Sequence, residues 1–116
     1  MWQKAMSLAS LVHQIAPHLP RHELFGLASQ MRRAAVSIPS NIAEGAARRT
    51  TREFLSFLYV ARGSAAELDT QLLLARNLGY LPADAADPAR LLTDEVARLL
   101  SAVIASLHRR LGSPSS

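Results

Sequence analysis

An unbroken helical period between residues 54 and 75 restricts the fold more than any other feature of this sequence. Small and apolar residues recur there at alternating steps of four and three, at Phe54, Leu58, Ala61, Ala65, Leu68, Leu72 and Ala75. This spacing places all of them on one side of a helix, as in the contact seam of a helical bundle. A helix of about 28 residues, roughly 40 Å long, can bury such a seam only against other helices. The sequence therefore predicts an all-α protein.

Three further segments have the helical period and complete the predicted bundle. They are Met1 to about Ala16, which Pro17 and Pro20 end, a second helix from Arg21 and His22 to Glu44, and a fourth helix from about Ala89 to Leu111. The second helix is expected to bury Leu24, Leu27, Met31, Ala34, Ile38 and Ile42. Short connections at 46–49 and 80–88 favour an antiparallel up-down-up-down four-helix bundle. We expect one domain, residues 1–111, followed by a disordered polar tail, residues 112–116.

Local signals indicate where the helices end and where one of them bends. Thr50 and Glu53 form a capping box at the start of the third helix, and Gly79 lies just after its end. Gly45 is expected to take the left-handed conformation that ends the second helix. Pro39, inside that helix, removes a backbone donor and crowds the preceding turn, so we expect a proline kink there rather than a break.

The third helix has more apolar residues than a single seam can bury. Leu55, Tyr59, Ala66 and Leu73 form a second strip, about a quarter to a third of a turn from the seam. A helix that is apolar on several sides belongs at the centre of a large protein or at a subunit interface. A chain of 116 residues is too small for the first arrangement. We therefore expect a homo-oligomer with these four residues in the interface.

The sequence lacks the residue patterns of most catalytic and cofactor sites. It has no cysteine, and no glutamate stands three residues before His13, His18, His22 or His108, as a carboxylate-bridged metal site in a bundle would require. The five glycines are scattered singly, so no glycine-rich loop can hold a phosphate. No apolar run approaches the roughly 18 residues of a membrane span. We expect a soluble, cytoplasmic protein that is not an enzyme and has no catalytic residues, metal, cofactor or membrane partner.

The positive charge is concentrated in the middle of the chain. Thirteen basic residues against nine acidic ones give a net charge of +4, and twelve of the thirteen are arginine. Six arginines lie in or near the second and third helices, at Arg32, Arg33, Arg48, Arg49, Arg52 and Arg62. In an antiparallel pair, Arg33 and Arg62 should lie at a similar height, roughly 18 to 20 Å from the turn, and the other arginines should extend this basic edge to the turn. Such an edge suits phosphate, although contacts within an assembly explain the arginines nearly as well.

Three further arginines receive a structural interpretation. Arg98 follows Asp94 by one turn, which is the spacing of an ion pair within a helix. Arg109 and Arg110 lie in the last turn of the fourth helix, where positive charge complements the helix dipole. We therefore leave these three residues out of the predicted nucleic-acid site.

Three runs in the central part of the chain carry a resemblance to a known family. They are RRAAVSIPSNIAEG at 32–45, RRTTREFLSFL at 48–58 and GSAAELDTQL at 63–72. They resemble the small four-helix-bundle proteins encoded in intervening sequences of bacterial 23S ribosomal RNA genes. That family is similar to the accessory variability protein of diversity-generating retroelements, a ring-forming bundle thought to handle nucleic acid. The resemblance implies a cyclic homo-oligomer, with a pentamer as the expected assembly.

Two hypotheses for the function follow from the sequence. In the first, a ring of bundles binds structured RNA, or an RNA/DNA hybrid, through the basic edge, and Tyr59 is available to stack on a base. In the alternative, the ring is a protein-interaction scaffold that does not bind nucleic acid. It would present a polar strip of the second helix to another protein, made of Ser37, Ser40, Asn41 and Glu44.

Overall fold

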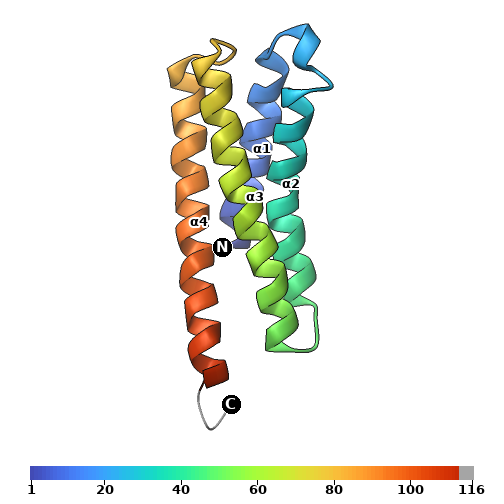
Figure 1. The fold of residues 1–116 in the computed structure, drawn as a ribbon, viewed down its shortest axis with the longest axis vertical. Helices are drawn as coiled ribbons and strands as arrows, with labels where there is room; N and C mark the ends of the chain where they lie inside the picture. The colour runs from blue at the N-terminus through green and yellow to red at the C-terminus, as the bar shows by residue number, and fades with distance from the viewer. Residues whose placement is uncertain (113–116) are drawn as a thin grey trace.

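The computed structural model describes residues 1–112, which form four α-helices packed side by side (Figure 1). The helices are α1 (Trp2–Ile15), α2 (Leu27–Ala46), α3 (Thr51–Asn77) and α4 (Ala83–Gly112), and two short 3-10 helices, η1 (Ala16–His18) and η2 (Arg21–Glu23), lie between α1 and α2. Consecutive helices pack against each other, and α1 also packs against α4. The predicted four-helix bundle is confirmed.

The four helices differ in length, so the two ends of the bundle differ. α1 has 14 residues, whereas α3 has 27 and α4 has 30. One end holds the connections at 16–26 and 78–82, and we name it the loop end. The other end holds the α2–α3 connection (residues 47–50), the first turns of α3 and the last turns of α4, and we name it the hairpin end. α1 begins short of the hairpin end, where only α2, α3 and α4 remain (Figure 1).

The core follows the predicted helical periods. On α3, the seam residues from Leu58 to Ala75 are buried, and Phe54 at the hairpin end is half-buried. α2 contributes Met31, Ala34, Ile38 and Ile42, and α4 contributes Val96, Leu100, Ile104 and Leu107. The alanines among the leucines of this seam allow the neighbouring helices to pack closely against α3. The seam was therefore a reliable guide to the core.

The second apolar strip of α3 is not one continuous exposed surface. Leu55 is only 4 % exposed and belongs to the core of the single chain, because α4 packs over this side of α3. Leu73 is half-buried, whereas Ala66 and Tyr59 are exposed. The argument that Leu55 needs a second subunit to cover it is therefore wrong.

α2 begins later and ends later than the sequence suggested. Arg21–Glu23 forms the separate 3-10 helix η2, and Leu24, expected on the buried side, is 41 % exposed in the connection. α2 continues through Gly45 to Ala46, so Gly45 is a helical residue and not a left-handed cap. The helix also continues through Pro39 without a break. The size of any kink at Pro39 stays a prediction.

α4 begins six residues before the predicted start and includes Pro88. The carbonyl of Pro82 accepts hydrogen bonds from the amides of Ala85 (3.0 Å) and Ala86 (2.9 Å), which starts the helix. Pro88 is the sixth helical residue, so it cannot donate the backbone hydrogen bond that this position would otherwise make to the Asp84 carbonyl in the first turn. α4 includes Gly112, which was expected in the tail, and the rest of the predicted tail, residues 113–116, lies outside the described residues.

The predicted ends of α3 are confirmed. The Thr50 hydroxyl accepts a hydrogen bond of 3.1 Å from the Glu53 amide, which caps the first turn. At the other end Gly79 has φ +75°, and the amides of Gly79 and Tyr80 bond the carbonyls of Arg76 (3.0 Å) and Ala75 (2.9 Å). These two bonds form a Schellman motif, and they fix where α3 stops.

Gly45 lies where α2 packs closely against α3, and this position gives a testable prediction. A Cβ added at Gly45 would lie 2.7 Å from the Phe57 Cβ and 3.0 Å from the Phe54 Cδ1. We expect Gly45→Ala to lower the free energy of unfolding by about 1–2 kcal/mol, because overpacking outweighs the better helix propensity of alanine. Thermal unfolding followed by circular dichroism measures this change.

Gly63→Ala is the matched control for Gly45→Ala. Gly63 is also inside a helix, but a methyl group there would meet no described atom within 4 Å. This substitution should raise the free energy of unfolding by up to about 1 kcal/mol. Equal effects of the two substitutions would contradict the close approach at Gly45.

Candidate nucleic-acid interface

The hairpin end gathers arginines from three different helices or connections. They are Arg48 and Arg49 before α3, Arg52 and Arg62 on α3, and Arg109 and Arg110 at the end of α4. The up-down topology brings the last turns of α4 to the first turns of α3, although the two segments are about fifty residues apart in sequence. Glu44 and Glu53 are the acidic residues that accompany them among the residues described there. The result is a strongly basic end of the bundle.

Two of these arginines have partners inside the chain. The Arg48 guanidinium bonds the Glu44 carboxylate at 2.8 Å and lies 4.9 Å from the centre of the Phe57 ring. Arg62 lies 5.1 Å from the centre of the Tyr59 ring and donates to the Ser101 hydroxyl at 3.5 Å. These contacts hold both side chains against the bundle, and they use only part of the five donors of each guanidinium.

The remaining four arginines are exposed and form no ion pair with a carboxylate of residues 1–112. They are Arg49, Arg52, Arg109 and Arg110. Sequence reasoning had assigned Arg109 and Arg110 to the helix dipole alone. The signal that was missed is topological, since an up-down bundle must place the end of the fourth helix beside the start of the third.

Arg32 and Arg33 do not continue this basic end. Arg32 donates to the Leu24 carbonyl at 3.3 Å near the loop end, and Arg33 lies beside Ser64 and Glu67. The Ser37 and Ser64 hydroxyls are 2.8 Å apart, so Arg33 is level with residues near Glu67 and not with Arg62. The prediction that Arg33 and Arg62 lie at a similar height is therefore wrong. The first turn of α3 extends further toward the hairpin end than the last turn of α2, and this shifts the residues of α3 relative to those of α2. Arg62 also points toward α4, away from the α2–α3 groove.

The polar strip of α2 bonds mainly within the chain. Ser37 pairs with Ser64, and the Asn41 amide donates to the Ser37 carbonyl at 2.7 Å and to its hydroxyl at 3.0 Å. Glu44 holds Arg48, and Ser40 is exposed beside α1. The strip therefore helps to join α2 to α3, which leaves few of its polar groups for a partner.

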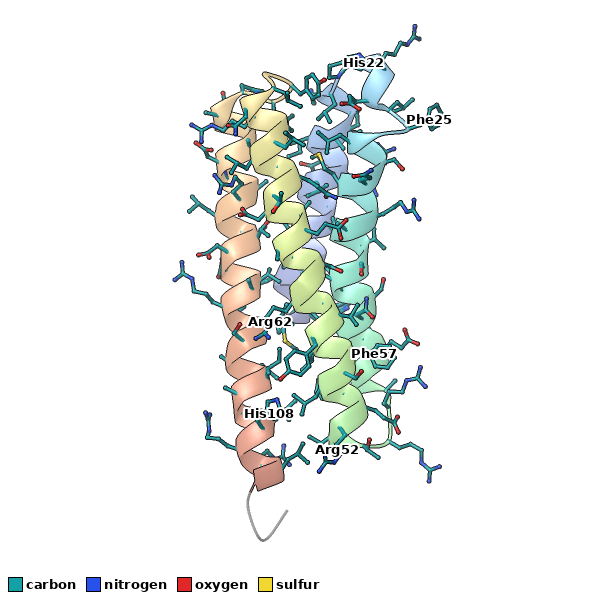
Figure 2. The ribbon with its side chains drawn as sticks, viewed as in Figure 1. His22, Phe25, Arg52, Phe57, Arg62 and His108 are labelled. Carbon is teal, nitrogen blue, oxygen red and sulfur yellow. The ribbon has the colours of Figure 1, made fainter. Side chains whose placement is uncertain are left out.

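The first turns of α3 and the last turns of α4 enclose a groove of about 520 Å³. Its walls are Arg52, Leu55, Ser56, Tyr59, His108, Leu111 and Gly112. The Tyr59 hydroxyl and the His108 Nε2 are hydrogen-bonded across it, and the two ring centres are 6.0 Å apart. Figure 2 shows Arg52, Arg62 and His108 together on this part of the molecule. We name it the Tyr59 groove.

A larger groove of about 620 Å³ lies nearer the loop end, also between α3 and α4. Acidic residues line it and pair with two of its three arginines, Arg90 with Asp69 at 3.0 Å and Arg76 with Asp87 at 3.3 Å, whereas Arg62 also lines it without such a pair. The hydrogen bond to Asp69 raises the pKa of Arg90. Because Arg90 and Arg76 are already paired with carboxylates, this groove is a poorer phosphate site than the hairpin end.

Comparison with known proteins places the fold in a family. A family model described as "23S rRNA-intervening sequence protein" matches residues 1–102. The chain belongs to this family. Among solved structures, the chain is similar to a protein with unknown function of the S23 ribosomal protein family from Bacteroides thetaiotaomicron. The two are 22 % identical, the match covers 89 % of this chain and 96 % of the other, and the TM-score is 0.83. A search of curated proteins gives no significant match.

Within the described residues, no three His, Cys, Asp or Glu side chains come close enough together to hold a metal ion. Among residues 1–112, none of the helices combines the length and the apolarity that a bilayer crossing requires. The basic hairpin end is thus the surface with the clearest chemical character.

Proposed function

We propose that this protein binds structured RNA, or an RNA/DNA hybrid, through the hairpin end and without catalysing a reaction. The observation that supports this most is the set of exposed arginines that pair with no carboxylate of residues 1–112, which come together from α3, α4 and the α2–α3 connection. Guanidinium groups bind phosphate oxygens through paired donors and stay charged at every physiological pH. A surface of this kind supplies affinity for a nucleic-acid backbone with little sequence discrimination.

We further propose that the protein acts as a cyclic homo-oligomer, with the pentamer implied by its family resemblance. The exposed side of α3 supports this, since Val60 is 51 %, Leu74 is 45 % and Leu78 is 51 % exposed. These three residues recur at helical spacing on one side of α3 and form an apolar strip that water disfavours, whereas Ala66 and the half-buried Leu73 lie on another side of the helix. Tyr59 already bonds His108 in the groove, so we assign the subunit contact to the part of α3 beyond Tyr59.

Leu74→Arg tests the proposed subunit contact. We expect a smaller particle by light scattering and unchanged helicity by circular dichroism, because the charge faces the neighbouring subunit and not the core. Phe25→Arg is the control, since Phe25 is 92 % exposed in the connection before α2 and should leave the mass unchanged. A monomeric wild-type protein, or an unchanged mass in Leu74→Arg, would contradict the contact.

A salt titration tests the proposed RNA binding. The purified protein is titrated into a labelled RNA hairpin, and separately into a duplex DNA of the same length, and anisotropy is followed at several salt concentrations. Between 50 and 200 mM salt we expect the affinity for RNA to fall about ten-fold or more, because several phosphate contacts release counterions. No binding at low salt would refute the proposal and favour the protein-interaction scaffold.

A further inference from the structure

The Tyr59 groove has chemical features that a simple basic surface does not need. Tyr59 is 42 % exposed, and a hydrogen bond from its hydroxyl to His108 fixes the ring at the mouth of a groove between two helices. Leu55 and Leu111 also line the groove and make part of its surface apolar. Arginines on a flat surface would bind phosphate equally well, so phosphate binding alone does not need a groove.

The charges around the groove favour an anionic ligand with a flat, apolar part. Arg52 lines the groove, Arg62 lies 5.1 Å from the centre of the Tyr59 ring, and no Asp or Glu of the described chain lines it. An aromatic ring held against a guanidinium, with a second arginine one to two helical turns away, matches a base joined to its phosphates. Its volume of about 520 Å³ falls within the range of small-ligand sites, about 300–1,000 Å³.

We propose that the Tyr59 groove takes one unpaired nucleotide of a bound RNA. The base stacks on Tyr59, and the phosphates beside it bind Arg52 and Arg62. This inference rests on the proposed RNA binding and adds to it the kind of RNA preferred, which is a duplex carrying a bulged or looped-out nucleotide. The base of a paired nucleotide is covered by its neighbours in the stack, so it cannot reach a ring that lies between two helices.

The chain contains a second tyrosine–histidine pair that serves as an internal control. At the loop end the Tyr80 hydroxyl bonds the His22 Nε2 at 3.3 Å, and the two rings meet edge to face with centres 5.9 Å apart. Burial, the charge of Glu23 and a hydrogen bond to Glu23 raise the pKa of Tyr80, so this pair has an acidic neighbour where Tyr59 has arginines. Tyr80 is therefore expected to make no contribution to RNA affinity.

The experiment compares two RNAs that differ by one nucleotide. One is a fully paired hairpin, and the other has the same stem with a single bulged 2-aminopurine. The wild-type protein should bind the bulged RNA about 5- to 150-fold more tightly, which is the range for stacking one base on an aromatic side chain. The 2-aminopurine fluorescence should fall on binding, because stacking on an aromatic ring quenches it.

Substitutions at Tyr59 and Tyr80 test whether the preference for the bulged RNA depends on the Tyr59 ring. Tyr59→Ala should bind both RNAs equally and lose the fluorescence change, whereas its affinity for the paired hairpin stays within about two-fold of wild type. Tyr59→Phe keeps the ring and should retain the preference. Tyr80→Ala should behave as wild type. If Tyr59→Ala unfolds, Tyr59→Leu keeps apolar volume at the site and gives the same comparison.

The outcomes separate this inference from the proposed function. Equal binding of both RNAs by the wild-type protein, or a preference that persists in the folded Tyr59→Ala or Tyr59→Leu variant, would overturn the nucleotide site and leave RNA binding intact. No binding of either RNA would overturn both.

Discussion

Reversing the charge of Arg49 and Arg52 is expected to lower the affinity for a paired RNA hairpin about a hundred-fold at 0.1 M salt. Both side chains are exposed at the hairpin end and form no ion pair with a described carboxylate, so the substitution disturbs no internal contact. Each phosphate contact contributes roughly ten-fold at this salt concentration through counterion release. The measurement is an anisotropy titration of the double variant Arg49→Glu, Arg52→Glu at several salt concentrations. The slope of log K against the logarithm of the salt concentration should be smaller in magnitude by about two than for the wild-type protein.

A second double variant tests whether RNA affinity depends on where the arginines lie or only on the net charge of the protein. Arg21→Glu with Arg33→Glu changes the total charge equally, but both residues lie outside the hairpin end and are exposed. We expect this variant to lose less than about five-fold in affinity, since it alters only the long-range field. Equal losses in the two double variants would mean that RNA responds to overall charge. Loss of the oligomer in the hairpin-end variant would assign Arg49 and Arg52 to assembly instead.

Leu55→Arg should destabilise the bundle itself. Leu55 is 4 % exposed in the single chain, so the substitution removes a buried leucine and forces a charge against Leu58 and the last turns of α4. Losing a core leucine typically costs about 3 kcal/mol or more, and a displaced cation adds to this. For a domain of this size we expect the melting temperature to fall by about 12 °C or more, as measured by circular dichroism.

The same substitution distinguishes the two interpretations of α3. Had Leu55 been covered by a second subunit, Leu55→Arg would have yielded stable, helical monomers. An unchanged melting temperature with a halved or smaller mass would therefore restore the interface first inferred from the sequence. Leu74→Arg, on the exposed side of the same helix, should show the reverse pattern of effects.

The sequence was sufficient for the fold because each helix has its own period. The seam from Leu58 to Ala75, the cap at Thr50 and the stop at Gly79 all depend on residues close together in the chain. The start of α4 was missed for an equally local reason. A proline near the first turn of a helix reads in sequence as an interruption, and Pro88 occupies such a position in α4.

The candidate site was harder to predict because it depends on the register between helices. The sequence contained every arginine of the hairpin end, but it could not show that α3 begins beyond the end of α2, which separates Arg33 from Arg62. It also could not show that His108 of α4 forms a hydrogen bond with Tyr59 of the neighbouring helix α3. Both facts depend on how far one helix slides along another, and side-chain packing over the whole interface determines that distance.

The short α1 gives the two ends of the molecule different local stabilities. Beyond Leu100, α4 buries only Ile104 and Leu107 among its described residues, because no fourth helix covers this segment. Backbone amides there should exchange with deuterated solvent through local opening, well before those of the segments where all four helices pack together, which require global unfolding. A ligand held between α3 and α4 would slow exchange in these turns alone. The segment we assign to RNA can thus adjust to its ligand while the rest of the bundle keeps its structure.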